Sequence, residues 1–166
     1  MYGPSARQRI ERETPGALGE ALRFGGIVVG GWYGIAWYRE FWMSLHDILG
    51  VDEAAARRIG HHSARISVNV AYRALARMTS PSMLLSMSAR AFGYYYEPAS
   101  LCVKQPDAKR LTAEWRDCDG FDSLIWSEVE GGATYFIEAT GVTGVSLSVI
   151  SGGGDANFML ATATWR

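Results

Sequence analysis

Residues 99–116, ASLCVKQPDAKRLTAEWR, decide the fold class of this chain. Apolar residues alternate with polar ones over 101–103 and again over 111–115. Between these segments, Pro106-Asp107 favours a turn. A period of two on both sides of a turn predicts an antiparallel hairpin with one buried face and one face in water.

The remainder of the C-terminal part predicts a helix followed by a second hairpin. An apolar stripe at helical spacing covers residues 124–136, and alternation returns at 145–149 and 158–162 around the glycine turn 151–155. Gly131-Gly132 lies inside the helix, where each glycine costs about 1 kcal/mol relative to alanine. A close approach of this helix to the sheet would account for that cost.

Helical periodicity dominates the first two thirds of the chain. It predicts a helix over 34–49 that ends at Gly50, a second that begins after Asp52, and a third that begins at Ser80-Pro81 and runs to about Tyr96. The apolar run 24–29 is a strand candidate. The predicted fold class is therefore α+β, with an antiparallel sheet (hairpin–helix–hairpin) packed against three to four helices and a short N-terminal strand.

Length and composition predict one globular domain. The chain has 166 residues, of which 48% are hydrophobic and 20% charged, as expected for a domain with a single core. Residues 1–16, with two prolines and only Ile10 as a large apolar residue, predict a flexible arm ahead of a domain over 17–166. The uncharged stretch 24–38 is too short and too glycine-rich to span a bilayer, so we expect a cytoplasmic protein without a transmembrane segment.

No motif in the sequence indicates catalysis, a metal or a cofactor. Serine-hydrolase and zinc-protease signatures are missing, and the glycine-rich stretch 25–34 lacks both phosphate-loop patterns. Cys102 and Cys118 give neither a disulfide framework nor metal spacing. Asp117 and Asp119 should raise the pKa of the Cys118 thiol. The prediction is a protein that is not an enzyme and has no cofactor.

A run of arginines without acids marks a candidate anion site. Residues 54–96 contain no Asp or Glu but six Arg. Such a run produces a positive field, and arginine binds anions in a bidentate manner. The predicted site for an anionic partner or head group consists of Arg57, Arg58, His61 and Arg65. Neighbouring arginines would repel a divalent cation, so the His61-His62 pair does not predict a metal site.

The aromatic content is the most informative feature of the helical half. The chain has 6 Trp, 8 Tyr and 6 Phe, and ten of these residues are crowded into 32–42 and 92–96. A single apolar stripe covers only about 100° of a helix, so these rings indicate a large core, a ligand cavity or a partner surface. The predicted wall of an apolar ligand site consists of Trp37, Phe41, Met83, Met87, Tyr95 and Phe136.

Several local strings accompany this order of elements. They are Gly31-Trp32-Tyr33 with Trp37-Tyr38-Arg39, the run Ala71-Tyr72-Arg73-Ala74-Leu75, Ser80-Pro81, Tyr94-Tyr95-Tyr96 and Gly131-Gly132. Over residues 20–166 the chain thereby resembles the superfamily of TRAPP small subunits and 4-vinyl-reductase-type ligand-sensing domains, in an uncharacterised bacterial branch.

The resemblance implies an apolar channel between helices and sheet, pairing of subunits through helices, and a role as scaffold or small-molecule sensor. Both cysteines lie at or after residue 102, which departs from the cysteine of the TRAPP-type acyl channel and from the cysteine cluster of some 4-vinyl-reductase-type domains. A covalent acyl group and a metal are therefore not expected.

Two function classes follow from the sequence. The first is a non-catalytic binding module that acts as a protein-interaction scaffold, pairs as a homodimer through its helices, or binds an apolar small molecule. The alternative is a helix-turn-helix DNA-binding regulator built on residues 54–78, whose spacing of Ala56, Gly60 and Ile66 imitates that motif. Asn69 occupies a position that such a motif normally buries, and the pI of about 6.3 is not basic, so nucleic acid is not an expected partner.

Overall fold

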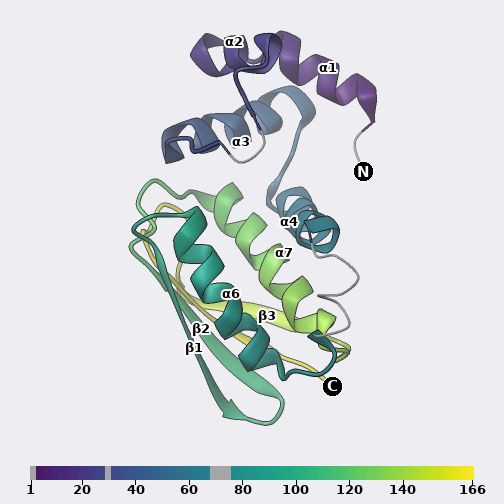
Figure 1. Ribbon diagram of the computed structural model, residues 1–166, viewed down its shortest axis with the longest axis vertical. Helices are drawn as coiled ribbons and strands as arrows, with labels where there is room; N and C mark the ends of the chain where they lie inside the picture. The colour runs from purple at the N-terminus through teal and green to yellow at the C-terminus, as the bar shows by residue number, and fades with distance from the viewer. Residues whose placement is uncertain (1–2, 29–30, 68–75) are drawn as a thin grey trace.

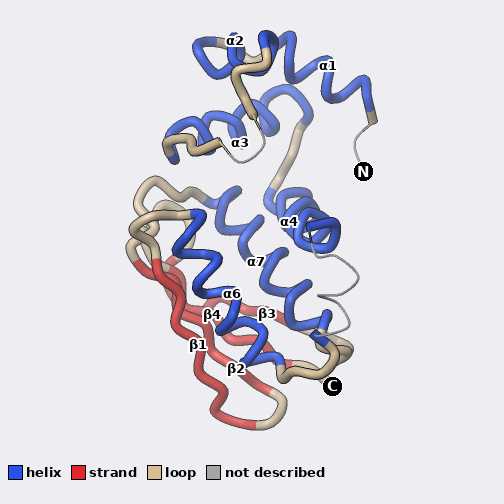
Figure 2. Tube along the Cα trace, in the orientation of Figure 1, coloured by secondary structure: helices blue, strands red, loops and turns tan. Residues whose placement is uncertain are grey.

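The C-terminal half forms the predicted antiparallel sheet. The computed structural model describes residues 3–28, 31–67 and 76–166. Its strands are β1 (Ser100–Asp107), β2 (Arg110–Arg116), β3 (Ser146–Gly152) and β4 (Met159–Thr164), in the order β1-β2-β4-β3. All neighbouring strands are antiparallel (Figure 2). The α+β class and the two hairpins are therefore confirmed.

The alternation along β2 explains why one face of the sheet is buried. Leu111, Ala113 and Trp115 are each 1% exposed and face the helices, whereas Arg110 and Arg116 are exposed. Ala113 lies opposite Ala161 on β4. Side chains this small keep the buried face shallow there, which lets a helix pack close to the strands.

Helices α6 (Pro81–Tyr95) and α7 (Ser123–Ala139) pack on that face (Figure 1). The Ser80-Pro81 start signal of α6 is confirmed, and the structure shows Asp122 as the N-cap of α7. The Ser80 hydroxyl accepts from the Met83 amide at 3.2 Å, and Asp122 Oδ1 accepts from the Leu124 and Ile125 amides at 3.1 and 3.0 Å. Each cap satisfies amides that have no partner inside the helix.

Helix α4 (Glu53–Ser67) crosses the outside of α7 (Figure 1). Gly60 of α4 lies against the Glu128 carbonyl, and Gly131 of α7 lies against the Arg57 carbonyl. The cost of Gly131 is thus explained by contact with another helix, not by the predicted approach to the sheet. The second half of the region predicted after Asp52 falls partly on residues 68–75, which lie outside the described residues.

The N-terminal part corrects two expectations. Residues 4–13, predicted as part of an arm, form helix α1 (Pro4–Glu13), in which Ile10 is 6% exposed. Helix α2 (Gly16–Phe24) ends where the strand candidate begins, and the described residues 25–28 form no strand. The apolar run follows a helix that stops at Gly25, whose φ of 74° is the left-handed conformation of a helix end.

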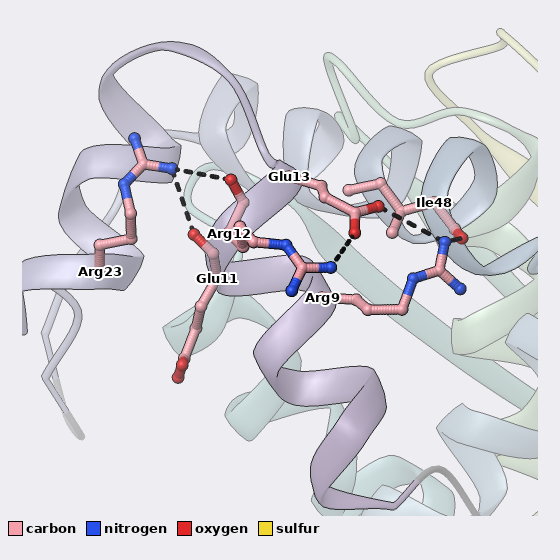
Figure 3. A network of polar contacts seen from close by, with 6 residues as sticks. All are labelled: Arg9, Glu11, Arg12, Glu13, Arg23 and Ile48. Carbon is pink, nitrogen blue, oxygen red and sulfur yellow. Dashed lines mark hydrogen bonds and ion pairs between the residues drawn. The ribbon is translucent and has the colours of Figure 1, made fainter.

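Arginine side chains connect α1 to α2 and to α3 (Ile35–Leu49). Arg23 donates to the Glu11 carbonyl at 3.2 Å, and Arg9 donates to the Ile48 carbonyl at 2.7 Å (Figure 3). These carbonyls belong to the last turns of α1 and α3, where backbone acceptors lack helical partners. We call α1–α3, residues 4–49, the N-terminal helical unit.

Aromatic rings fill the space between the helices and the sheet. Trp115 and Trp126 are 1% exposed, and Phe121 packs against Trp126 and Tyr96 with ring centroids 4.8 and 5.1 Å apart. Partly buried Tyr38 and Phe92 pack against this core. A single large core therefore accounts for these rings. Outside it, Phe24 is 83% and Trp32 60% exposed.

Candidate anion-binding groove

The crossing of α4 and α7 leaves a groove of about 510 Å³ along one side of the two helices. Both helices contribute to its lining, which combines cationic side chains with small residues. The lining residues are Ala54, Arg57, Arg58, His61 and His62 of α4 with Gly131 and Thr134 of α7. The groove exists where it does because Gly60 and Gly131 let the helix backbones touch at the crossing itself.

Two of the four basic side chains of the groove, Arg57 and His61, are held by acids of α7. Arg57 donates to Glu130 Oε2 from Nε at 3.0 Å and from Nη2 at 2.7 Å. His61 Nε2 lies 2.7 Å from Glu138 Oε2. Since Glu130 is only 8% exposed, its carboxylate needs the Arg57 partner to compensate for lost hydration. These pairs fix α4 on α7 and set the positions of Arg57 and His61.

The other two basic side chains of the groove, Arg58 and His62, have no acidic partner within the described ranges. Arg58 and His62 are exposed and lie one turn apart on the same face of α4. Arg65 continues this face three residues after His62 but does not line the groove. Arg58 and His62 therefore remain available to an anion from outside the chain.

The structure places three of the four predicted anion-site residues in one groove: Arg57, Arg58 and His61. Sequence reasoning did not include His62 and Thr134. His62 follows Arg58 by four residues, so helical spacing alone could have grouped them. Thr134 carries no such signal, because its place in the groove depends on how α7 meets α4.

The predicted apolar wall is not brought together. Met83 and Met87 are 55% and 50% exposed on α6, and half-buried Trp37 stacks on Tyr33 with ring centroids 6.1 Å apart. Phe41 is partly buried, Phe136 packs against the core, and the Tyr95 side chain lies outside the described part. None of the other five lines the α4–α7 groove or a second groove of about 280 Å³ between α1 and α3.

The surroundings of Cys118 do not suit a nucleophilic thiol, as the sequence predicted. Burial and, to a lesser degree, the charges of Asp117 and Asp119 raise the pKa of its thiol to about 12.

In the described part of the chain, no three His, Cys, Asp or Glu side chains gather in the manner of a metal site. No helix in the described ranges is both long and apolar enough to cross a bilayer.

The structure defines a class of α+β module: helices on one face of an antiparallel β1-β2-β4-β3 sheet, preceded by a helical unit. No protein-family model matches the sequence, and no curated protein matches it. Among solved structures, the chain has the fold of H-NOX domains. An Fe(II) unliganded H-NOX protein from K. algicida superposes with a TM-score of 0.71 at 12% identity, over 99% of this chain and 88% of that one.

Two further H-NOX structures agree. A mutant H-NOX domain from T. Tengcongensis gives a TM-score of 0.60 at 11% identity, covering 100% of this chain and 98% of that one. A structure described in connection with heme distortion in the H-NOX family gives 0.63 at 10% identity, covering 96% and 86%. At these identities the likeness establishes the fold.

This finding overturns the resemblance to TRAPP small subunits and 4-vinyl-reductase-type domains, and with it the implied channel and scaffold function. The order of helices and hairpins suits both folds, so it did not discriminate between them. The helix-turn-helix alternative is also wrong. Residues 53–67 form one continuous helix, and Gly60 lies in the contact with α7, not in a turn.

Proposed function

We propose that this chain is a non-enzymatic sensor module on the H-NOX fold that binds a small organic anion in the α4–α7 groove. The observation that carries the proposal is that two arginine and two histidine side chains line one groove, while only Arg57 and His61 are paired with acids of α7. The anion would carry phosphate or paired carboxylate groups, which suit the planar donor array of arginine.

The dimensions of the groove favour a small molecule over a macromolecule. Its volume of about 510 Å³ lies within the range of roughly 300–1,000 Å³ typical of small-molecule sites. Arg57 and His61, held by Glu130 and Glu138, provide a pre-positioned side of the site at little entropic cost on binding. Arg58 would supply the charge that the bound anion neutralises, and His62 would offer a ring N–H as a hydrogen-bond donor beside it.

A structure of the H-NOX family is described in connection with heme distortion, so we consider which side chains of this chain could bind heme iron. Heme iron takes His, Cys, Met or Tyr as protein ligand. His46 Nδ1 lies 2.9 Å from the Val51 carbonyl at the end of α3, His61 lies against Glu138, and His62 is exposed. None of the three lies between the helices and the sheet.

The buried donors fit heme no better. Burial raises the pKa of Tyr38 and of Tyr96 far above the usual range and that of Cys118 to about 12, so all three keep their protons at neutral pH as long as no metal ion is bound. Rings of the aromatic core fill the space beside them. Side chains of the described residues thus occupy the space that a heme would need between helices and sheet, and the proposed function does not use one.

Calorimetric titration tests the anion site, with pyrophosphate and citrate as probes at low salt. We expect saturable binding of at least one probe, and the preferred probe separates a phosphate site from a paired-carboxylate site. Arg58→Glu should weaken binding at least tenfold and His62→Ala severalfold. Arg90→Glu, the same charge change on an exposed residue of α6, should leave affinity unchanged. Equal losses in the Arg58 and Arg90 variants, or no saturable binding, would overturn the proposal.

A hemin titration provides the complementary test. We expect no heme absorption band that saturates at one heme per chain. A stoichiometric band that survives in Arg58→Glu would place a heme site elsewhere and contradict a heme-independent sensor. The homodimer through helices and the cytoplasmic location remain predictions, and the first is checked by light scattering of the purified chain.

A further inference from the structure

The second groove, of about 280 Å³, lies between the end of α1 and one face of α3, and we call it the α1–α3 groove. Its α3 residues stand at positions 40, 43, 44, 47 and 48, a spacing that places them in one stripe along the helix. The lining includes Glu13 of α1 with Glu40, Met43, Ser44, Asp47 and Ile48 of α3. The groove thus combines carboxylates with apolar side chains.

Only one of the three carboxylates is neutralised by the chain. Glu13 pairs with Arg12 at 2.6 Å and with Arg9 at 3.4 Å (Figure 3). Glu40 and Asp47 form no ion pair with any residue that the structure describes. The five arginines of the N-terminal helical unit are engaged elsewhere, at Glu11, at Glu13, at the α1 carbonyls, and at Asp122 with Asp155. Glu40 and Asp47 are therefore available to a cation from outside the chain.

These two carboxylates lie at opposite ends of the stripe. Seven residues of helix separate them by about 10 Å along the axis. Glu40 Oε1 lies 3.5 Å from the position of a Cβ atom built on Gly16, so its carboxyl reaches across to the start of α2. Within the described residues, the acids do not gather with others in a metal site. Their spacing therefore suits an elongated cation with charge at both ends.

Ser44 is an independent sign of a ligand in the α1–α3 groove. It lies between Glu40 and Asp47 in the stripe, lines the groove, and is only 6% exposed. Its hydroxyl has no hydrogen-bond partner in residues 3–28, 31–67 and 76–166. A buried hydroxyl without a partner loses the hydrogen bonds that it makes with water. A donor from a ligand in the groove would restore one of them.

The apolar part of the lining limits the shape of that ligand. Met43 is 52% exposed, Ile48 is half-buried, and both lie beside the carboxylates in the stripe. They offer contacts to a chain of methylene groups. The volume of about 280 Å³ lies just below the range of roughly 300–1,000 Å³ typical of drug-sized molecules. A slim aliphatic chain therefore fits the groove better than a ring system.

We propose that the α1–α3 groove binds a linear aliphatic polyamine. Its terminal ammonium groups would pair with Glu40 and Asp47, and its methylene groups would lie on Met43 and Ile48. Ser44 stands four residues after Glu40 and three before Asp47, so an internal ammonium group would donate to its hydroxyl. A triamine therefore matches the groove better than a diamine. This site takes a cation, and it does not depend on the anion site of α4 and α7.

Calorimetric titration with spermidine at low salt tests the site. We expect saturable binding of one spermidine per chain and at least fivefold weaker binding of putrescine, which has two ammonium groups closer together. Mg²⁺ should bind more weakly still, because the carboxylates do not converge. The net charge of the chain is only −1, so general attraction of polycations contributes little. Added salt should weaken the binding, since the pairs are partly exposed.

Matched variants separate the groove from other acids of the same unit. Glu40→Gln and Asp47→Asn should each weaken spermidine binding at least threefold. Glu20→Gln, the same change at an exposed position of α2 outside the groove, should leave it unchanged. Ser44→Ala should weaken binding without lowering the midpoint of thermal unfolding of the ligand-free protein, because no hydrogen bond within the described structure is lost.

Amide NMR of the wild type locates the site without any variant. Spermidine should shift signals of residues 13–16 and 40–48 most. Shifts centred elsewhere, no saturable binding, equal losses in the Glu20 and Glu40 variants, or Mg²⁺ binding as tight as that of spermidine would each refute the proposal. Arg58→Glu should bind spermidine like the wild type. Failure here is therefore distinguishable from failure of the proposed function.

Discussion

Gly131 of α7 lies so close to Arg57 of α4 that a Cβ atom on Gly131 would overlap the Arg57 carbonyl oxygen. Gly60 makes the reciprocal contact with the Glu128 carbonyl. The two helices therefore cross backbone against backbone, and the absence of two side chains determines where the cationic groove lies. This contact also holds Arg57 within reach of Glu130.

Adjacent glycines of α7 provide a matched test of this contact. Gly131→Ala should lower the free energy of unfolding by about 1–3 kcal/mol, because the new methyl group has to push α4 away. Gly132→Ala meets nothing within 4 Å and should raise it by up to about 1 kcal/mol through helix propensity. Urea denaturation followed by circular dichroism measures both. Similar effects at the two positions would show that α4 lies further from α7 at Gly131 than in the structure described above.

Neighbouring arginines of α4 should differ in their effect on stability. Arg57→Ala leaves the buried Glu130 carboxylate without its partner and should lower the free energy of unfolding by about 1–3 kcal/mol. Arg58→Ala removes a side chain with no acidic partner in the described ranges and should change it by no more than about 0.5 kcal/mol. Thermal unfolding of both variants checks this. A large loss in the Arg58 variant would contradict the assignment of Arg58 to ligand binding alone.

Two substitutions of Asp122, the N-cap residue of α7, separate the contribution of the cap from that of the ion pair with Arg39. Asp122→Ala loses the acceptor for the Leu124 and Ile125 amides and should cost about 1–2 kcal/mol. Asp122→Asn keeps an acceptor and loses only the charge that faces Arg39 at 3.4 Å, so its cost should stay below about 1 kcal/mol. Urea midpoints of the two variants give the comparison. Equal losses would mean that the ion pair, not the cap, stabilises this end of α7.

The two cysteines should react at different rates. The pKa of Cys118 is about 12, so its thiol stays protonated until far above neutral pH, and the side chain is also buried. Cys102 is exposed on β1. Iodoacetamide at pH 8 should therefore add one label to the folded chain, at Cys102, and a second after unfolding in urea. Mass spectrometry of the intact chain and its peptides shows both. Labelling of Cys118 in the folded chain would contradict its burial.

Local signals predicted most elements of the sheet half. Alternation along 111–115 reports which face of β2 is buried, and Ser80-Pro81 marks the start of α6 through short-range hydrogen bonding. Helix α1 was not predicted, because its order depends on contacts from elsewhere. Arg23 of α2 caps its carbonyls, and Arg9 reaches Ile48 of α3.

Local sequence signals could not predict the fold family. An order of helices and hairpins is shared by unrelated α+β folds and does not specify how helices cross. Gly131-Gly132 signalled a close approach, but the sequence did not say which element approaches. That is why the α4–α7 crossing was predicted as a contact with the sheet.

The sequence by itself determined the two hairpins, several helix ends and a cation-rich segment around residues 57–65, because each depends on residues a few positions apart. The tertiary structure decided which of those cations face a groove and which acids neutralise them. Arg57 and Glu130 are 73 residues apart, and His61 and Glu138 are 77 apart. Such pairs form only once packing has fixed the crossing of two helices, and local periodicity does not specify that crossing.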